Sequence, residues 1–381
     1  MMNPYNCTEP NNAFVGYDRL LQQLQDGFRD GHSFAIIGGR RCGKTSLLRQ
    51  LEKVLPDADV QPLRFLPRYI DIQGLDKVTI ETLFEAVYSQ TVRDIETARS
   101  GRSVSSQPVA SDKPYQGFLS SMDDVKPLLD EKYGGDWVVV LLVDELDAAL
   151  ASLPNDQFFQ NMRNLLMTSR FHRHFRLVAS GVGNLTDLIS SGSSPLNNLR
   201  AQYLTILSVK QARKLLSFGF AEGFDDDLEQ MLFRMTGRHP YLLQGLLEKL
   251  WIDKNHLTKN DLKSSARAFL REHHDFHRWL EAFGDTERAV YKILTETLDR
   301  SMDLRDIRGR LAPHLKQKID NALTTLSYHG VIDDSDPDEP QVSSALFCDW
   351  YKENAPIASK AEKGNPSPVQ ETVRSPATPS T

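Results

Sequence analysis

The sequence has little cysteine. Only Cys7, Cys42 and Cys348 occur among the 381 residues, and they lie far apart along the chain. A disulfide framework or a thiolate zinc site needs cysteines at short, repeated spacings, so neither is indicated. This usage is typical of a reducing compartment, and we expect the protein to be cytoplasmic.

Long apolar runs and a surplus of positive charge are also missing. No apolar run approaches the roughly 20 residues that a membrane span requires, and the polar N-terminus does not resemble a signal peptide. The formal net charge is −6, whereas a nucleic-acid-binding chain is typically basic. The composition, 40% hydrophobic and 25% charged, indicates a globular chain of two or three domains without a membrane partner.

The most informative stretch is residues 34–51. It opens with an apolar run that predicts a strand and closes with apolar residues at helical spacing. Between the two, Gly38 is followed after four residues by Gly43, Lys44 and Thr45, which is the spacing of a P-loop. In such a loop, backbone N–H groups and the N-terminus of the helix face a phosphate. The predicted phosphate-binding residues are Gly38, Gly39, Arg40, Arg41, Cys42, Gly43, Lys44, Thr45 and Ser46.

The side chains of this loop predict a magnesium-bound nucleoside triphosphate as the ligand. Lys44 supplies a mobile positive charge for the β- and γ-phosphates, and the Thr45 hydroxyl can ligate Mg²⁺. The positive potential of the loop could lower the pKa of Cys42. We favour the plainer interpretation, in which Cys42 is a small residue that fills a loop position.

An acidic pair supplies the second half of the predicted site. Residues 137–143 form a continuous apolar run, which is typical of a strand buried in a parallel sheet, and the run ends at Asp144 and Glu145. A carboxylate at this strand end can reach the coordination sphere of Mg²⁺, so Thr45 and Asp144 are the predicted metal ligands. Glu145 is placed to activate the attacking water.

Two further polar residues follow later strands. Ser180 comes at the end of the strand 175–179, where it could reach the γ-phosphate or the water, or could simply begin a turn before Gly181. Arg200 precedes a strand predicted at 203–207 and could serve a neighbouring subunit as an arginine finger, or be an ordinary surface arginine.

The stretch after Gly237 has a similar ambiguity. Arg238, His239 and Pro240 could sense the nucleotide from a helical lid, although Gly237 and Pro240 also read as the stop and start signals of two helices. Farther along, three histidines surround Asp275. They could bind a metal, but a solvated, charged helix face is the interpretation we favour.

Alternating strand and helix signals predict an α/β fold, with a parallel P-loop NTPase sheet core followed by a helical lid and a winged-helix domain. This order of signals divides the chain into five parts. Within the core, residues 99–114 are rich in Ser, Pro and Gly and predict a flexible insertion. The divisions are a flexible N-terminus 1–12, the core 13–207, the lid 208–283, the winged helix 284–355 and a disordered tail 356–381.

The winged-helix prediction rests on three helices, at 287–298, 304–311 and 315–329, followed by a hairpin. Its loop, residues 333–339, contains five carboxylates. A wing of this kind normally lies along the phosphate backbone, which repels carboxylates. We therefore favour contact with a protein partner or self-association over duplex DNA, although three arginines in 304–311 keep DNA open as an alternative.

Taken together, the motifs resemble those of P-loop ATPases of the AAA+/STAND superfamily, and more narrowly of the archaeal-ATPase group, which is related to origin-initiator ATPases. The matching segments, in order along roughly 14–354, are GGRRCGKTSLL at 38–48, YIDIQGL at 69–75, LLVDELD at 141–147, TGRHPYLLQ at 236–244 and SALFCDWYKE at 344–353. The resemblance implies that Val15 and Gly16, in a segment that normally reads F-V-G-R, cradle adenine. Tyr17 stands where the arginine is usual.

The resemblance implies an ATP-controlled switch with slow hydrolysis, using ATP and Mg²⁺. Lys44, Glu145 and Arg200 are the predicted catalytic residues. The alternative function is an initiator or loader that assembles on duplex DNA. An inactive nucleotide-binding scaffold is disfavoured because the lysine, threonine and both acidic residues are intact.

Overall fold

The computed structural model covers the whole chain and describes most of it. The described residues are 3–6, 14–58, 63–93, 95, 108, 111–153, 157–190, 192–220, 224–251, 257–272, 275–297 and 301–361. Most of the predicted insertion 99–114 and the end of the predicted tail lie outside them.

A five-stranded parallel sheet forms the core. Its strands are β1 (Ser33–Ile37), β2 (Arg64–Asp71), β3 (Trp137–Asp144), β4 (Phe175–Gly181) and β5 (Leu199–Tyr203), in the order β2-β3-β4-β1-β5. Every residue of β3 is buried, as its continuous apolar run predicts. β2 is an edge strand, where Pro67 is tolerated because one side of the strand needs no hydrogen bonds. The predicted α/β fold class is confirmed.

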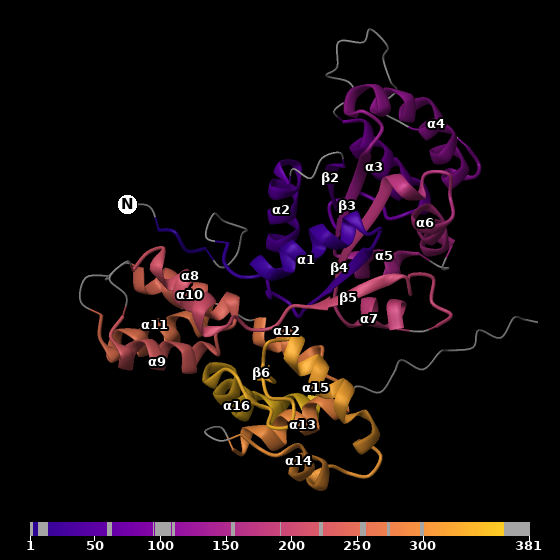
Figure 1. Cartoon of the computed structure of the whole chain (residues 1–381). Helices are drawn as coiled ribbons and strands as arrows, with labels where there is room; N and C mark the ends of the chain where they lie inside the picture. The colour runs from indigo at the N-terminus through magenta and orange to yellow at the C-terminus, as the bar shows by residue number, and fades with distance from the viewer. Residues whose placement is uncertain are drawn as a thin grey trace, which may run out of the picture.

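Helices cover both faces of the sheet (Figure 1). On one face, α1 (Asp18–Arg29) and α2 (Lys44–Val54) pack their apolar stripes on β1 and β3. The other face carries α3 (Ile80–Val92), α4 (Pro114–Tyr133), α5 (Leu146–Ser152), α6 (Gln157–Met167) and α7 (Gly183–Ser190). None of the described helices is both long and apolar enough to cross a membrane.

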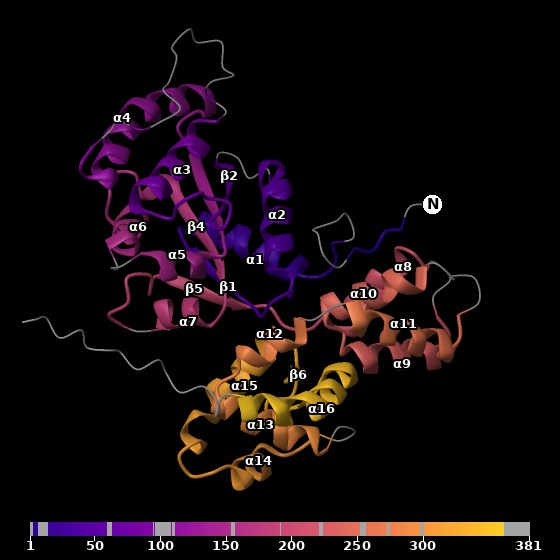
Figure 2. The same cartoon turned by 180° about the vertical axis from the view of Figure 1, so that it is seen from behind.

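Two helical units follow the sheet. The lid helices are α8 (Val209–Ser217), α9 (Asp226–Thr236), α10 (Pro240–Leu250), α11 (Lys259–Glu272) and α12 (Asp275–Glu281). The C-terminal unit comprises α13 (Asp285–Thr295), α14 (Leu304–Arg310), α15 (Ile319–Tyr328), the hairpin of β6 (Ile332–Asp333) and β7 (Gln341–Val342), and α16 (Ala345–Ala361). One continuous apolar cluster runs through both units, and Figure 2 shows them side by side below the sheet.

Several sequence-based boundaries differ from the structure. The N-terminus was expected to be flexible, but Tyr5 is buried and its hydroxyl donates to Leu216 O at 2.6 Å, because its ring fills space against α8. Strand β5 begins at Leu199, so Arg200 lies within the strand and does not precede it. Helix α16 continues to Ala361, past the predicted domain end at 355.

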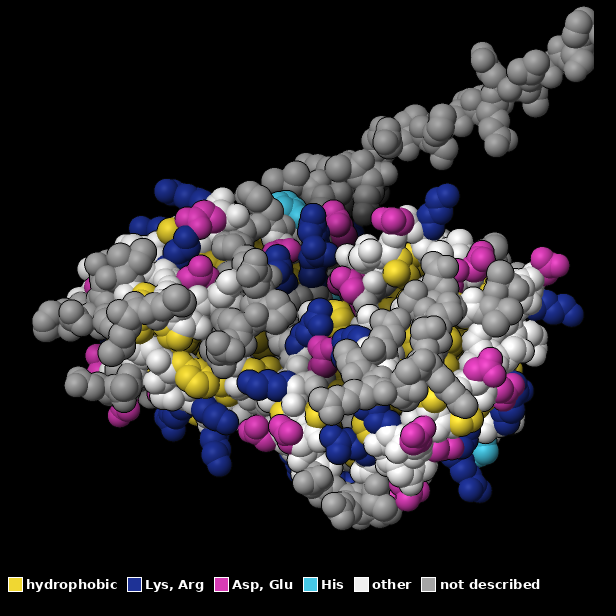
Figure 3. Space-filling model, turned by 90° about the horizontal axis from the view of Figure 1, so that it is seen from above, with side chains coloured by type: hydrophobic (Ala, Val, Ile, Leu, Met, Phe, Trp, Pro, Cys, Tyr) yellow, Lys and Arg dark blue, Asp and Glu magenta, His cyan; other side chains and the backbone are white. Residues whose placement is uncertain are grey.

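Charged side chains of both signs are interspersed on the face seen from above in Figure 3, over the sheet core. A nucleic-acid-binding face typically gathers Lys and Arg into one patch. The described side chains on this face form no such single-sign patch.

Candidate functional site

The P-loop follows the carboxyl end of β1 and leads into α2. Gly43 has a φ of 92°, in the left-handed region that glycine adopts without strain, and α2 begins at the next residue. The ammonium of Lys44 donates to Gly38 O and to Gly39 O, both at 2.9 Å. Burial lowers the pKa of Lys44, and the negative charges of Asp144, Glu145 and Asp147 oppose that shift. A cation is thus held over the loop beside the acidic pair.

Asp144 is held by hydrogen bonds at both carboxylate oxygens. Ser180, on the neighbouring strand β4, donates to Oδ1, and Tyr69, on the other neighbour β2, donates to Oδ2 at 2.8 Å. The guanidinium of Arg49 lies 3.3 Å from the centre of the Tyr69 ring, so α2 fixes the ring from above. Tyr69 is not among the residues predicted from the sequence, because its role depends on β2 lying in register beside β3, where Asp71 pairs with Asp144.

The backbone conformation and the pKa of Glu145 both depart from ordinary values. Its φ is 56°, and its backbone N–H donates to Ser180 Oγ at 3.1 Å. Burial, and then the adjacent negative charge of Asp144, raise the pKa of Glu145, which favours proton acceptance from a bound water. Ser180 therefore positions both acidic residues. None of its described contacts supports the plainer interpretation, in which it only begins a turn before Gly181.

These residues fit MgATP. The N-terminus of α2 and the glycine turn offer backbone N–H groups to a phosphate, and nothing lies within 4 Å of where a Cβ on Gly43 would stand. Thr45, in the first turn of α2, and Asp144 offer the hard oxygen ligands that Mg²⁺ prefers. When bound, the metal would neutralise charge on the phosphates.

Backbone strain is concentrated in the sequence motifs. The non-glycine residues with positive φ among the described part of the chain are Tyr17, Arg41, Glu145 and Arg238, at 62°, 67°, 56° and 57°. Each belongs to one of four motifs picked out from the sequence. Such conformations cost about 1–3 kcal/mol each and persist where surrounding contacts over-determine them, which is typical of functional sites.

The two P-loop arginines are bound by the lid helices. Arg40 Nε lies 3.2 Å from Asp275 Oδ1, and Arg41 Nε lies 3.5 Å from Oδ2. Tyr241 donates to the same Oδ2 at 2.9 Å, and Arg41 also lies over the Tyr241 ring at 5.3 Å. Asp275 is 9% exposed, so the expected solvated helix face is wrong at this residue. Of the neighbouring histidines, His273 and His274 lie outside the described residues.

The C-terminal unit also contacts the P-loop, at the end of α15. Gly39 N–H donates to Tyr328 O at 2.7 Å, and Cys42 Sγ lies 3.3 Å from the same oxygen. A Cβ on Gly39 would lie 2.7 Å from both Cα and Nδ1 of His329, so this position requires glycine. Burial raises the pKa of Cys42 to about 11, which excludes a lowered thiol pKa and supports its role as a filler.

His239 completes this junction from the lid. It is fully buried, caps α10 by accepting from Tyr241 N–H, and places Nε2 3.5 Å from Cys42 Sγ. A Cβ on Gly330 would lie 2.5 Å from its ring. Pro240 is the first residue of α10, as the capping interpretation predicts. The P-loop, the lid and the C-terminal unit therefore meet at one point.

Arg238 and Arg200 do not join the site. Arg238 lies 2.5 Å from Asp333 of the β6–β7 hairpin, because its strained backbone turns the side chain away from the P-loop and toward the C-terminal unit. Arg200 is exposed and pairs with Phe34 at the start of β1, whereas the P-loop follows the end of β1. A role for Arg200 toward a neighbouring subunit stays a prediction.

The segment before α1 contacts the back of the P-loop. Tyr17 Oη lies 3.3 Å from both Cys42 O and Thr205 O. A Cβ on Gly16 would lie 3.1 Å from Leu207, and Val15 is buried in the same cluster as Leu207. Tyr17 thus replaces a charged contact with hydrogen bonding to the loop backbone. The adenine-binding role of Val15 and Gly16 stays a prediction.

Solved structures with the same arrangement identify the fold. The chain is similar to the Walker-type ATPase PABY2304 of Pyrococcus abyssi, with 14% identity and a TM-score of 0.59 over 89% of this chain and 96% of that one. This is the fold of a P-loop ATPase. The chain is also similar to the ORC2 protein of Aeropyrum pernix, in ADPNP–ADP complexes, with 13% identity and a TM-score of 0.56 over 94% and 98%. No family model and no curated protein sequence matches it.

The buried histidines make the junction sensitive to acid. Burial, reinforced by the neighbouring His329, lowers the pKa of His239 to about 3, and burial with the Lys44 charge lowers the pKa of His329 to about 3. The unfolded chain binds protons below about pH 6.5 that the folded chain does not, so stability falls as pH falls from 6.5 toward 3. We expect a loss of about 2 kcal/mol per histidine at pH 5, measured by urea unfolding at pH 7.5 and 5.

The variant His239→Gln with His329→Gln should flatten this pH dependence between pH 7.5 and 5. His314 is exposed, so His314→Gln serves as the matched control and should keep the wild-type slope. An unchanged slope in the double variant would show that other groups cause the acid sensitivity.

Proposed function

We propose that the protein is an ATP-binding and ATP-hydrolysing switch, in which the state of the P-loop controls the positions of the lid helices and the C-terminal unit. The observation that carries this proposal is the junction at the P-loop. Arg40 and Arg41 bind Asp275 of the lid, and Gly39 binds Tyr328 of the C-terminal unit. A phosphate that rearranges the loop would therefore act on both units.

Hydrolysis is assigned to the acidic pair. Glu145 would orient and deprotonate the attacking water, while the Lys44 ammonium would bind the β- and γ-phosphates. Asp144 and Thr45 would hold Mg²⁺, with Tyr69 and Ser180 fixing the orientation of Asp144. The likeness to P-loop ATPase structures supports nucleotide binding in this place, and the raised pKa of Glu145 supports its role as the base.

A set of ring contacts extends from the junction into the C-terminal unit. His329 lies 5.3 Å from Phe283 between ring centres, Phe283 lies 6.4 Å from Tyr291, and Tyr291 lies 4.9 Å from Tyr351 of α16. A close-packed interior has low compressibility and transmits strain. This packing supports a response of the whole unit when the P-loop changes.

The acidic wing supports a protein partner or self-association over duplex DNA. The wing is the loop of residues 333–339, and its residues 335–339 are exposed. Asp333 forms an ion pair with Arg238, whereas Asp336, Asp338 and Glu339 are exposed. Their charge opposes a phosphate backbone.

Two substitutions separate binding from hydrolysis. Lys44→Ala removes the phosphate-binding cation and should abolish ATP binding, whereas Glu145→Gln should keep binding and slow hydrolysis by about 10²–10⁴-fold. Binding is measured with a fluorescent ATP analogue and hydrolysis by phosphate release. Glu145→Gln that hydrolyses ATP at the wild-type rate would refute the assignment of the base.

Tyr69→Phe tests the positioning of Asp144. The ring stays under Arg49, but one carboxylate oxygen loses its hydrogen bond, so we expect the Mg²⁺ concentration for half-maximal nucleotide binding to change about 3–10-fold. This concentration is measured by titrating Mg²⁺ while nucleotide binding is followed, with EDTA as the metal-free reference. Tyr115→Phe removes another tyrosine hydroxyl, which is bonded to Asn164 of α6, and should leave this concentration unchanged.

Gly39→Ala tests the contact between the P-loop and the C-terminal unit. The added methyl group would clash with the backbone of His329, so the unit should separate from the loop at a cost of about 1–3 kcal/mol. Small-angle scattering should show a larger radius of gyration, and proteolysis between β5 and α8 should accelerate. Gly309→Ala in α14, where a Cβ meets nothing within 4 Å, is the control and should behave as wild type.

A further inference from the structure

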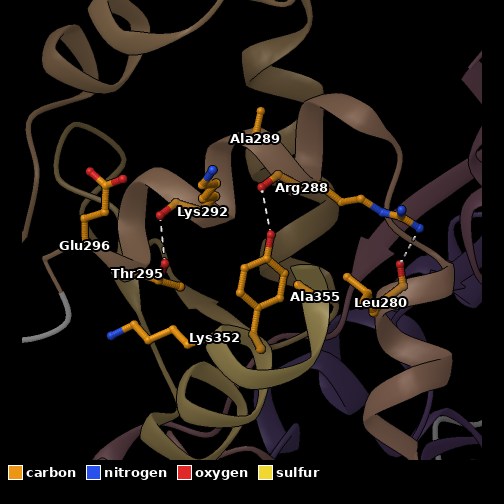
Figure 4. Close-up of a pocket in the computed structure, with 9 residues that line it drawn as sticks. Leu280, Arg288, Ala289, Lys292, Thr295, Glu296, Lys352 and Ala355 are labelled. Carbon is orange, nitrogen blue, oxygen red and sulfur yellow. Dashed lines mark hydrogen bonds between the residues drawn. The ribbon is translucent and has the colours of Figure 1, made fainter. Parts of the chain in front are cut away.

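The C-terminal unit contains a groove that the nucleotide site does not use. Its volume is about 640 Å³, and it lies between α13 and α16 next to the end of α12 (Figure 4). The Tyr351 hydroxyl donates to Arg288 O at 3.2 Å and ties the two helices together beneath it. The apolar part of the lining consists of Leu280, Ala289, Tyr351 and Ala355.

The rim of the groove is positively charged. Lys292 of α13 and Lys352 of α16 are both exposed and line it, and Figure 4 shows them on the two helices that form its sides. Glu296, the carboxylate in the lining, lies 3.2 Å from Arg310, which neutralises it. The groove therefore suits a ligand with a small apolar group between two negative charges.

The tip of the wing has this pattern. Asp336, Pro337 and Asp338 are consecutive and exposed, so a proline ring projects between two carboxylates. The tip is held in place from below: Asp338 O accepts from Leu304 N at 2.9 Å, and Asp336 Oδ1 accepts from Asp338 N at 3.1 Å. A pre-ordered loop loses little conformational entropy on binding.

We propose that the wing of one copy of this chain docks into the groove of a second copy. Pro337 would cover Tyr351 and Ala355, while Asp336 and Asp338 would face Lys292 and Lys352. No wing residue is among the described residues that line the groove of its own chain. The wing is also anchored elsewhere, through Asp333 to Arg238. The contact is therefore between copies.

This contact joins two different surfaces, so it is head-to-tail and extends into chains of molecules unless a ring closes. A single loop tip covers much less than the roughly 800 Å² per partner of a standard interface, which makes the association weak and dependent on its charges. Tyr351 also ends the series of rings that reaches His329. Communication with the P-loop along this series rests on the proposed function, whereas docking itself needs no nucleotide.

Sedimentation velocity of the full chain without nucleotide tests the proposal. From about 10 to about 300 µM, at about 30 mM salt, the weight-average mass should rise by at least about half, and at about 500 mM salt it should return to the monomer value. Lys292→Glu with Lys352→Glu, or Asp336→Lys with Asp338→Lys, should each remain monomeric. Lys210→Glu with Lys263→Glu, at exposed sites on the lid helices, should associate as wild type.

Mixing the two charge-reversal variants provides the decisive result. The groove variant keeps a native wing and the wing variant keeps a native groove, and the reversed groove and reversed wing are also of opposite charge. The mixture should therefore associate although neither variant associates alone. A monomeric mixture, or a wild-type chain that stays monomeric at low salt, overturns the proposal. Because no nucleotide is present, this failure is distinct from a failure of ATP binding in Lys44→Ala.

Discussion

The hydrogen bond from Gly39 N–H to Tyr328 O is the contact on which the arrangement of the three parts depends. It links the phosphate-binding loop to the end of α15, and it forms because residue 39 has no side chain to clash with His329. Around it, Cys42 and His239 close the space so that two imidazoles are buried. The candidate nucleotide site is therefore built from the sheet, the lid and the C-terminal unit together.

The strain at the motifs follows from this arrangement. Arg41 must turn its side chain toward Asp275, and Arg238 must turn toward Asp333, while both backbones stay in contact with the core. Each turn costs free energy, which the charged hydrogen bonds and the buried apolar clusters offset. Both strained backbones are therefore held by ion pairs that connect different parts of the molecule.

The sequence was sufficient for the core of the site and insufficient for its surroundings. The P-loop, β3 and Asp144 could be predicted because local spacing and apolar runs determine them. Tyr69 could not, because its role depends on which strand lies next to β3. The burial of Asp275 could not be predicted either, since nothing in the local sequence shows that α12 packs beside the P-loop.

Arg238 is another residue whose role could not be predicted from its local sequence. Its motif resembles a nucleotide sensor, and the local signals for a helix stop and start were correct, yet its guanidinium binds a carboxylate about a hundred residues later in the chain. The partner decides the role of a charged side chain, and partners across domains leave no periodic trace in sequence. The carboxylates of the wing differ in their partners. Asp333 belongs to the internal junction, whereas the exposed carboxylates beyond it contribute no described ion pair to the fold. Charges that look alike in the sequence therefore belong to different surfaces: Asp333 holds the C-terminal unit to the lid, whereas Asp336, Asp338 and Glu339 are exposed.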